Sequence, residues 1–156
     1  MLKSHYITCI PLFLLIFITS CTIESAAVEN IGPGRYPILT SEHWLELPYF
    51  TNLPIEIPHP DAERLIVIIH GSTRNARNYF NTLVRASEDI GKDDGSTIII
   101  APQFLIKIDL RERGIDGNVP YWSNGGWVRG DDSLYSDEFP RSASISSYEA
   151  LDTIVC

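Results

Sequence analysis

The sequence predicts an α/β fold, and three observations support that prediction. The run 65–69 is continuously apolar and rich in β-branched residues, which is typical of a strand buried on both faces of a parallel sheet. Residues 75–90 have a helical period, and 97–102 form a second strand-like run. A strand, a helix and a strand within this length predict a right-handed crossover between two parallel strands.

Composition bounds the class of protein. The chain of 156 residues is long enough for one domain, and 44% hydrophobic with 21% charged residues excludes wholesale disorder. The net charge is −8, and no run of basic residues offers a patch for nucleic acid. The histidines and cysteines lack the spacing typical of metal ligands, so we expect neither a metal nor another cofactor.

Residues 1–20 have the pattern of an export signal. A basic residue precedes the apolar run 7–18, and Ser20 stands directly before Cys21. This pattern resembles a bacterial lipoprotein signal peptide, which implies a protein held in the cell envelope by lipid on Cys21. Two alternatives remain: a cleaved signal with an incidental cysteine, which gives a secreted protein, and a retained anchor helix, which Pro11 disfavours.

The segment after the signal predicts a linker and then short strands. Residues 21–35 have no sustained period and end in Gly-Pro-Gly, so we expect a tether between membrane and domain. From residue 36 on, pieces such as 44–47 and 53–58 alternate in polarity and carry prolines. This favours edge strands that pair antiparallel at the start of the sheet.

The helix expected within 75–90 is marked at both ends. Asn75 or Asn78 can cap its N-terminus, and Gly91 can end it. Its apolar face repeats at helical spacing and consists of Ala76, Tyr79, Phe80, Leu83, Val84 and Ile90.

Beyond the second strand, residues 103–143 are expected to form a long irregular segment. A last helix is expected from 146, because Ser146 at the N-cap and Glu149 three residues later match a capping box. The sequence reaches Cys156 after about two to three turns of that helix, with no strand following.

The tripeptide His70-Gly71-Ser72 follows the first buried strand and opens the helix. In this setting the chain resembles the N-terminal half of the α/β-hydrolase superfamily, among its secreted or lipoprotein serine hydrolases of esterase or peptidase type. The resemblance covers residues 36–156. It implies a partial α/β-hydrolase fold, with antiparallel N-terminal strands and a parallel βαβ crossover, truncated before the nucleophile elbow. A sheet truncated there leaves an apolar strand edge open.

The resemblance implies roles for this turn. Gly71 and Ser72 would form part of an oxyanion hole through main-chain N–H groups, whereas a plain strand-to-helix turn is the alternative. His70 would support the loop, because the general base of this fold comes after the nucleophile. Arg74 would brace the loop or cap the helix.

Three further residues are candidates for a substrate pocket. Gln103 ends the second strand at the edge where ligands bind, although capping of the strand edge explains it equally well. Trp122 and Trp127 lie among glycines in the long segment, where they could line a pocket or anchor the loop.

Family members hydrolyse acyl or ester bonds of small molecules with a Ser-His-Asp triad. The chain contains no Gly-x-Ser-x-Gly and no late acid followed by histidine, so we expect it to be inactive alone. The alternative is a membrane-tethered module that binds carbohydrate or peptide through Trp122 and Trp127. A nucleotide-binding unit is disfavoured, because neither strand is followed by a glycine-rich phosphate loop.

Overall fold

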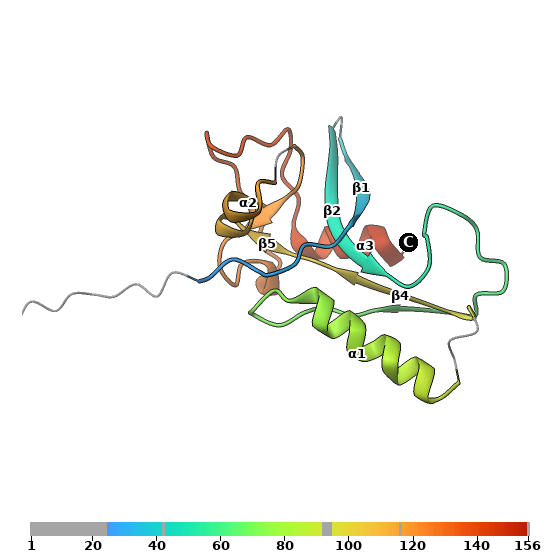
Figure 1. The fold of residues 1–156 in the computed structure, drawn as a ribbon. Helices are drawn as coiled ribbons and strands as arrows, with labels where there is room; N and C mark the ends of the chain where they lie inside the picture. Colours follow the sequence, from blue (N-terminus) through green and yellow to red (C-terminus); the bar gives the residue numbers. More distant parts are fainter. Residues whose placement is uncertain (1–24, 42, 92–94, 116, 156) are drawn as a thin grey trace, which may run out of the picture.

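The computed structural model describes residues 25–41, 43–91, 95–115 and 117–155. A four-stranded sheet in the order β1-β2-β4-β3 forms its centre (Figure 1). The strands are β1 (Gly34–Thr40), β2 (His43–Thr51), β3 (Arg64–Val67) and β4 (Thr97–Pro102). Cys21, the candidate lipid site, and residues 1–20 lie outside the described residues.

The sheet is mixed. β1 and β2 form an antiparallel hairpin, and β2 also runs antiparallel to β4. β3 and β4 run parallel, with Leu65 opposite Ile98 and Val67 opposite Ile100. Helix α1 (Ala76–Asp89) connects them. The α/β class and the parallel pair predicted from the sequence are therefore confirmed.

Helix α1 covers one face of the sheet. Its Phe80 stacks on Phe50 of β2, with ring centroids 6.1 Å apart. The predicted ends are confirmed, since Asn75 occupies the N-cap position and Gly91 follows the helix with φ +66°, but the Asn75 side chain makes no capping hydrogen bond. The apolar face is only partly buried, and Ile90 at its end is exposed.

Helix α3 (Ser147–Val155) packs on the opposite face. Ile100 of β4 belongs to the core cluster that includes α3, whereas the adjacent Ile99 borders a hollow together with Phe80 of α1, and adjacent strand residues point to opposite faces. Its N-cap is confirmed: the main-chain N–H of Glu149 donates to the Ser146 hydroxyl at 3.0 Å. The core on this side combines strand residues, loop aromatics and α3, and consists of Ile38, Leu45, Leu47, Tyr49, Ile100, Phe104, Trp122, Trp127, Ile145, Ala150 and Ile154.

Strand β3 differs from the expectation of burial on both faces. It lies at the edge of the sheet, and no described strand pairs with its outer side. Leu65 is consequently 44% exposed, and Ile66 and Val67 are only partly buried. An apolar run is therefore not sufficient evidence for a central strand. The open apolar edge that the sequence predicted is present among the described residues.

The segment 103–143 is more regular than expected. It contains β5 (Leu105–Ile106), α2 (Lys107–Arg113), β6 (Tyr121–Trp122) and the 3-10 turn η1 (Trp127–Arg129). β5 and β6 pair in parallel. These elements are too short to show a hydrophobic period. They enclose a second apolar cluster of Val28, Leu105, Leu110, Val119, Tyr121 and Phe139.

The linker predicted at 21–35 is corrected for residues 25–33, which we term the N-terminal arm. The arm lies against the domain, and its Val28 is 4% exposed within the second cluster. A Cβ added to Gly32 would lie 2.5 Å from the carbonyl oxygen of Tyr49. Glycine therefore permits close packing of the arm on β2 here, whereas the sequence suggested the end of a tether. Among the described residues, no helix is long and apolar enough to cross a bilayer.

Candidate functional site

The β3–α1 loop and the end of β4 meet at the carboxyl edge of the parallel strands, the edge at which ligands bind in α/β sheets. The main-chain N–H of Ile68 donates to the carbonyl of Ile100 at 2.9 Å and extends the pairing beyond β3. The loop then turns through His70, Gly71 and Ser72 into α1. Each sequence-predicted residue of this edge can therefore be located.

His70 joins the two strand ends. Its Nε2 accepts a hydrogen bond from the main-chain N–H of Phe104 at 2.9 Å, so the ring proton belongs on Nδ1. Nδ1 then donates to the carbonyl of Gly71 at 2.9 Å. The ring also contacts Trp127 edge to face, with centroids 4.6 Å apart. Both ring nitrogens are occupied, so His70 supports the loop.

Burial holds His70 neutral. The side chain is 2% exposed, and desolvation lowers its pKa to about 4, against an opposing hydrogen bond to Gly71. Nearby Arg74 lowers the pKa further, whereas Asp109 raises it. A neutral ring with no free nitrogen cannot act as a general base here, in agreement with the role that the resemblance implied.

Arg74 is the hub of a buried polar network. It adopts φ +58°, which is rare for a residue with a side chain, and is 1% exposed. Its Nε donates to Oδ2 of Asp109 at 2.7 Å and its Nη2 to Oδ1 at 3.2 Å, a two-point ion pair. Asp109 also accepts from the main-chain N–H groups of Val28 and Ile106. The buried charges are therefore satisfied on both sides.

The same guanidinium holds the loop and the N-terminal arm together. Nη1 donates to the carbonyl of Ser72 and to the hydroxyl of Ser25, both at 3.2 Å, and Nη2 donates to the carbonyl of Ala26 at 2.7 Å. Arg74 braces the loop, as one of the sequence interpretations proposed. Asp109 was missed, because its only sequence signal is an acid between two apolar residues of a short amphipathic stretch.

The expected pocket role of Gln103 is wrong: its side chain is buried and hydrogen-bonds to two neighbouring segments. Its Oε1 accepts from the N–H of Gly32 at 2.8 Å, and its Nε2 donates to the carbonyls of Asn30 and Arg74, each at 2.9 Å. The side chain is fully buried and joins the arm to the loop. It therefore faces no ligand.

Trp127 is likewise corrected, whereas Trp122 is buried and also borders a surface hollow beside Ser25. Trp122 is fully buried and donates from Nε1 to the carbonyl of Asp131 at 2.9 Å. Trp127 is 8% exposed and stacks on Phe104, with centroids 5.5 Å apart and an interplanar angle of 6°. Both rings anchor the loop, which was the second interpretation of the sequence.

The turn at Gly71 and Ser72 offers main-chain donors. The N–H of Arg74 closes it by donating to the carbonyl of Gly71 at 3.0 Å. Neither the N–H of Gly71 nor that of Ser72 has an acceptor among the described residues, and Ser72 is exposed. A Cβ on Gly71 would lie 2.7 Å from the hydroxyl at the end of the exposed Tyr79 side chain, which can move aside. Two adjacent donors at an exposed turn can bind a developing oxyanion.

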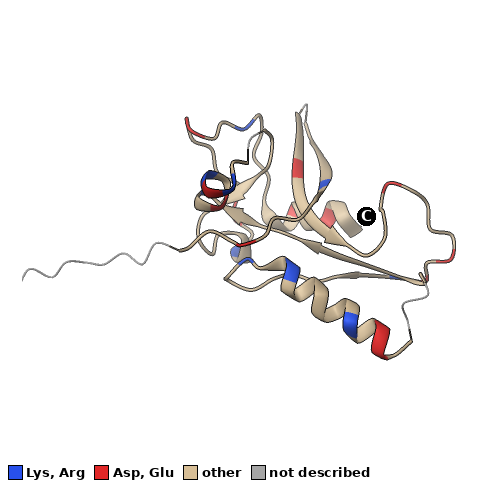
Figure 2. Cartoon of the chain, viewed as in Figure 1, with Lys and Arg blue, Asp and Glu red and all other residues tan. Residues whose placement is uncertain are grey.

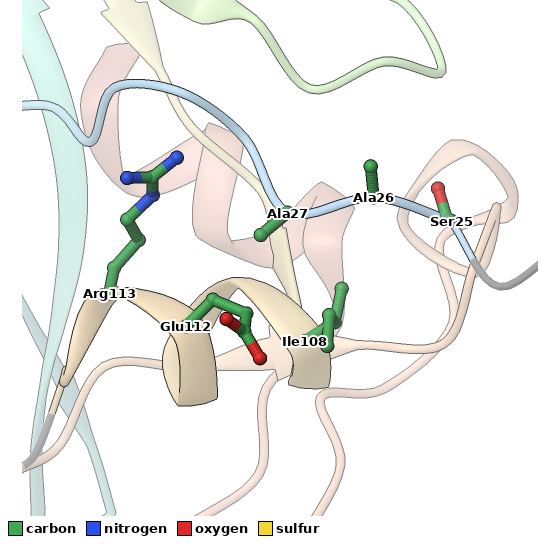
Figure 3. Close-up of a pocket in the computed structure, with 6 residues that line it drawn as sticks. All are labelled: Ser25, Ala26, Ala27, Ile108, Glu112 and Arg113. Carbon is green, nitrogen blue, oxygen red and sulfur yellow. The ribbon is translucent and has the colours of Figure 1, made fainter.

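Two hollows flank the start of the arm. One, of about 370 Å³, lies between the arm and α2 and is lined by Ser25, Ala26, Ala27, Ile108, Glu112 and Arg113 (Figure 3). The other, of about 320 Å³, lies between Ser25, the start of α2 and Leu134. No group of three or more metal-ligating side chains occurs in the part of the chain that the structure describes.

No protein-family model matches the chain, and no curated protein or solved structure is significantly similar to it.

Proposed function

We propose that the chain forms the N-terminal half of an exported, lipid-anchored α/β-hydrolase that cleaves acyl or ester bonds. In this assignment the main-chain N–H groups of Gly71 and Ser72 stabilise the tetrahedral oxyanion. The observation that carries the proposal is the exposed turn with two open donors between β3 and α1.

The position of the turn supports this function. In α/β-hydrolases one oxyanion donor comes from the loop between the third strand and the first helix, and Gly71 and Ser72 lie between β3 and α1. Two antiparallel strands precede the parallel pair, as expected at the start of such a sheet. The buried network around Arg74 holds the turn rigid, which preorganised donors require.

In this assignment the 156 residues supply part of the oxyanion hole and not the nucleophile. The first test is therefore to read the coding sequence beyond the codon for Cys156 in all three frames. A strand followed by Gly-x-Ser-x-Gly is expected. A long continuation without that motif would contradict the proposal.

The second test uses the polypeptide that includes this continuation. Ser72→Pro removes the main-chain donor and should lower kcat for a soluble ester by about 10²–10³-fold. Ser72→Ala keeps the N–H and is the matched control, with near-unchanged kcat expected. Equal activity of the two variants would remove Ser72 from the oxyanion hole. Residues 21–156 alone should show no turnover.

A further inference from the structure

The N-terminal arm begins at the same edge of the sheet as the candidate site. Ser25 and the carbonyl of Ser72 accept hydrogen bonds from the same nitrogen of Arg74. In Figure 1 the arm, in blue, enters beside α2 and β5, at the end of the molecule opposite the loop that joins β2 to β3. Ser25 therefore lies at the same end of the domain as the candidate site.

The arm cannot swing away without breaking buried contacts. The N–H of Val28 donates to Asp109, and the carbonyl of Val28 accepts from Nε of Arg113 at 2.6 Å. The N–H of Gly32 donates to Gln103. Each of these bonds is made within or at the rim of the core, so the arm is part of the folded domain.

The covalent chain limits how far this edge can lie from an anchor at Cys21. Three residues lie between Cys21 and Ser25, so four Cα-to-Cα steps join them, and an extended chain spans at most about 14 Å over that length. This limit holds for any path of the intervening residues. A free linker through residue 35 would allow several times that distance.

We propose, on the basis of the lipid anchor and the hydrolase site proposed above, that the carboxyl edge of the sheet faces the phospholipid headgroup surface at close range. The turn at Gly71 and Ser72 then opens toward the membrane, and its acyl substrate is reached at the lipid–water boundary. The surface that meets the lipid includes the 320 Å³ hollow beside Ser25.

Side chains around that hollow suit a lipid boundary. Leu134, which lines it, is 41% exposed, and the neighbouring Tyr135 is 67% exposed. Apolar and aromatic side chains partition favourably into the headgroup region. Charges of both signs are interspersed on α2 (Figure 2). Attraction of basic residues to anionic lipid is therefore not the basis of the orientation, which follows from the length and docking of the arm.

The experiment measures which end of the domain lies near lipid. Thr73→Cys or Asp61→Cys is introduced singly and labelled with a fluorophore in the lipidated chain carrying Cys156→Ser. Both positions are exposed, and they lie beyond opposite ends of β3, whose four residues alone span about 13 Å. The protein is bound to phosphatidylethanolamine–phosphatidylglycerol vesicles whose headgroups carry a nitroxide quencher.

The label at Thr73 should be quenched at least about twofold more than the label at Asp61, because the chain holds it near the anchor. Insertion of 16 Gly/Ser residues between Glu24 and Ser25 adds a tether of about 20–24 Å and should abolish this difference while vesicle binding remains. Circular dichroism of each labelled variant verifies the fold.

Two outcomes would overturn the inference and are distinguishable. Equal quenching at the two positions in the vesicle-bound protein removes the orientation and leaves the anchor and the hydrolase site intact. Failure of the full chain to bind vesicles, matched by a Cys21→Ser variant, removes the anchor and the orientation together. The activity tests of Ser72 are independent of both.

Discussion

At the scale of single residues, His70 shows how burial selects a role. The ring lies between two strand ends with both nitrogens bonded, and desolvation lowers its pKa to about 4. An imidazole that stays neutral above about pH 4 contributes to the fold and to the shape of the loop. It contributes no proton transfer.

This burial predicts a pH dependence of stability. The unfolded state takes up the proton near pH 6.5, whereas the folded state resists it until about pH 4, so the unfolded state binds more protons between these values. The free energy of unfolding should therefore fall as the pH drops from 6.5 to 4, by up to about 3 kcal/mol. Urea titrations at several pH values measure it.

The matched variant is His70→Gln, which has no titrating group. The part of the slope that belongs to His70 should be absent in this variant, while the slope due to other groups persists. Identical pH profiles for the two proteins would show that protonation of His70 is not linked to unfolding.

At the scale of elements, the Arg74–Asp109 pair connects the β3–α1 loop, α2 and the arm. Asp109→Asn keeps the shape of the side chain but leaves the buried guanidinium uncompensated. We expect a loss of about 3–5 kcal/mol in the free energy of unfolding, measured by urea denaturation. A variant that shows no cooperative unfolding transition would be the extreme case of this destabilisation.

Glu138→Gln is the control for this prediction. Glu138 also pairs with arginine, through Arg111, but its side chain is 40% exposed. Solvent screens such pairs, so its loss should leave the stability nearly unchanged. The importance of the buried network would be refuted by equal effects of the two substitutions.

The elements that the sequence predicted are those whose signals are local. β4, α1 and the start of α3 each carry a hydrophobic pattern or a capping residue within a few positions. The arm was misjudged because Gly32 has its partners on β2 and at Gln103, 71 residues away in sequence. Gln103 itself was misjudged for the same reason. Periodicity contains no information about which distant backbone group a buried amide will meet.

At the scale of the whole molecule, the sheet has two edge strands that differ in their protection. β1 carries Pro37, which lacks an N–H and discourages pairing with another chain. β3 has no proline, and its Leu65 is 44% exposed. The β3 edge is therefore the less protected of the two against self-association among the described residues.

A charged residue at this edge should reduce association. Leu65→Lys is expected to raise the monomer fraction at a given protein concentration, as measured by sedimentation velocity over a concentration series. Leu39→Lys on β1, where the leucine is 59% exposed, is the matched substitution and should have a smaller effect. A larger effect at β1 would show that association proceeds through the other edge.

The docked arm also determines where the folding unit begins. The first strand starts at Gly34, which makes that position an attractive boundary for recombinant expression. A protein begun there would lack Val28 and the backbone groups that Gln103, Asp109 and Arg74 bind. Their polar atoms would remain in the interior without counterparts. Expression boundaries for this domain therefore belong before Ser25.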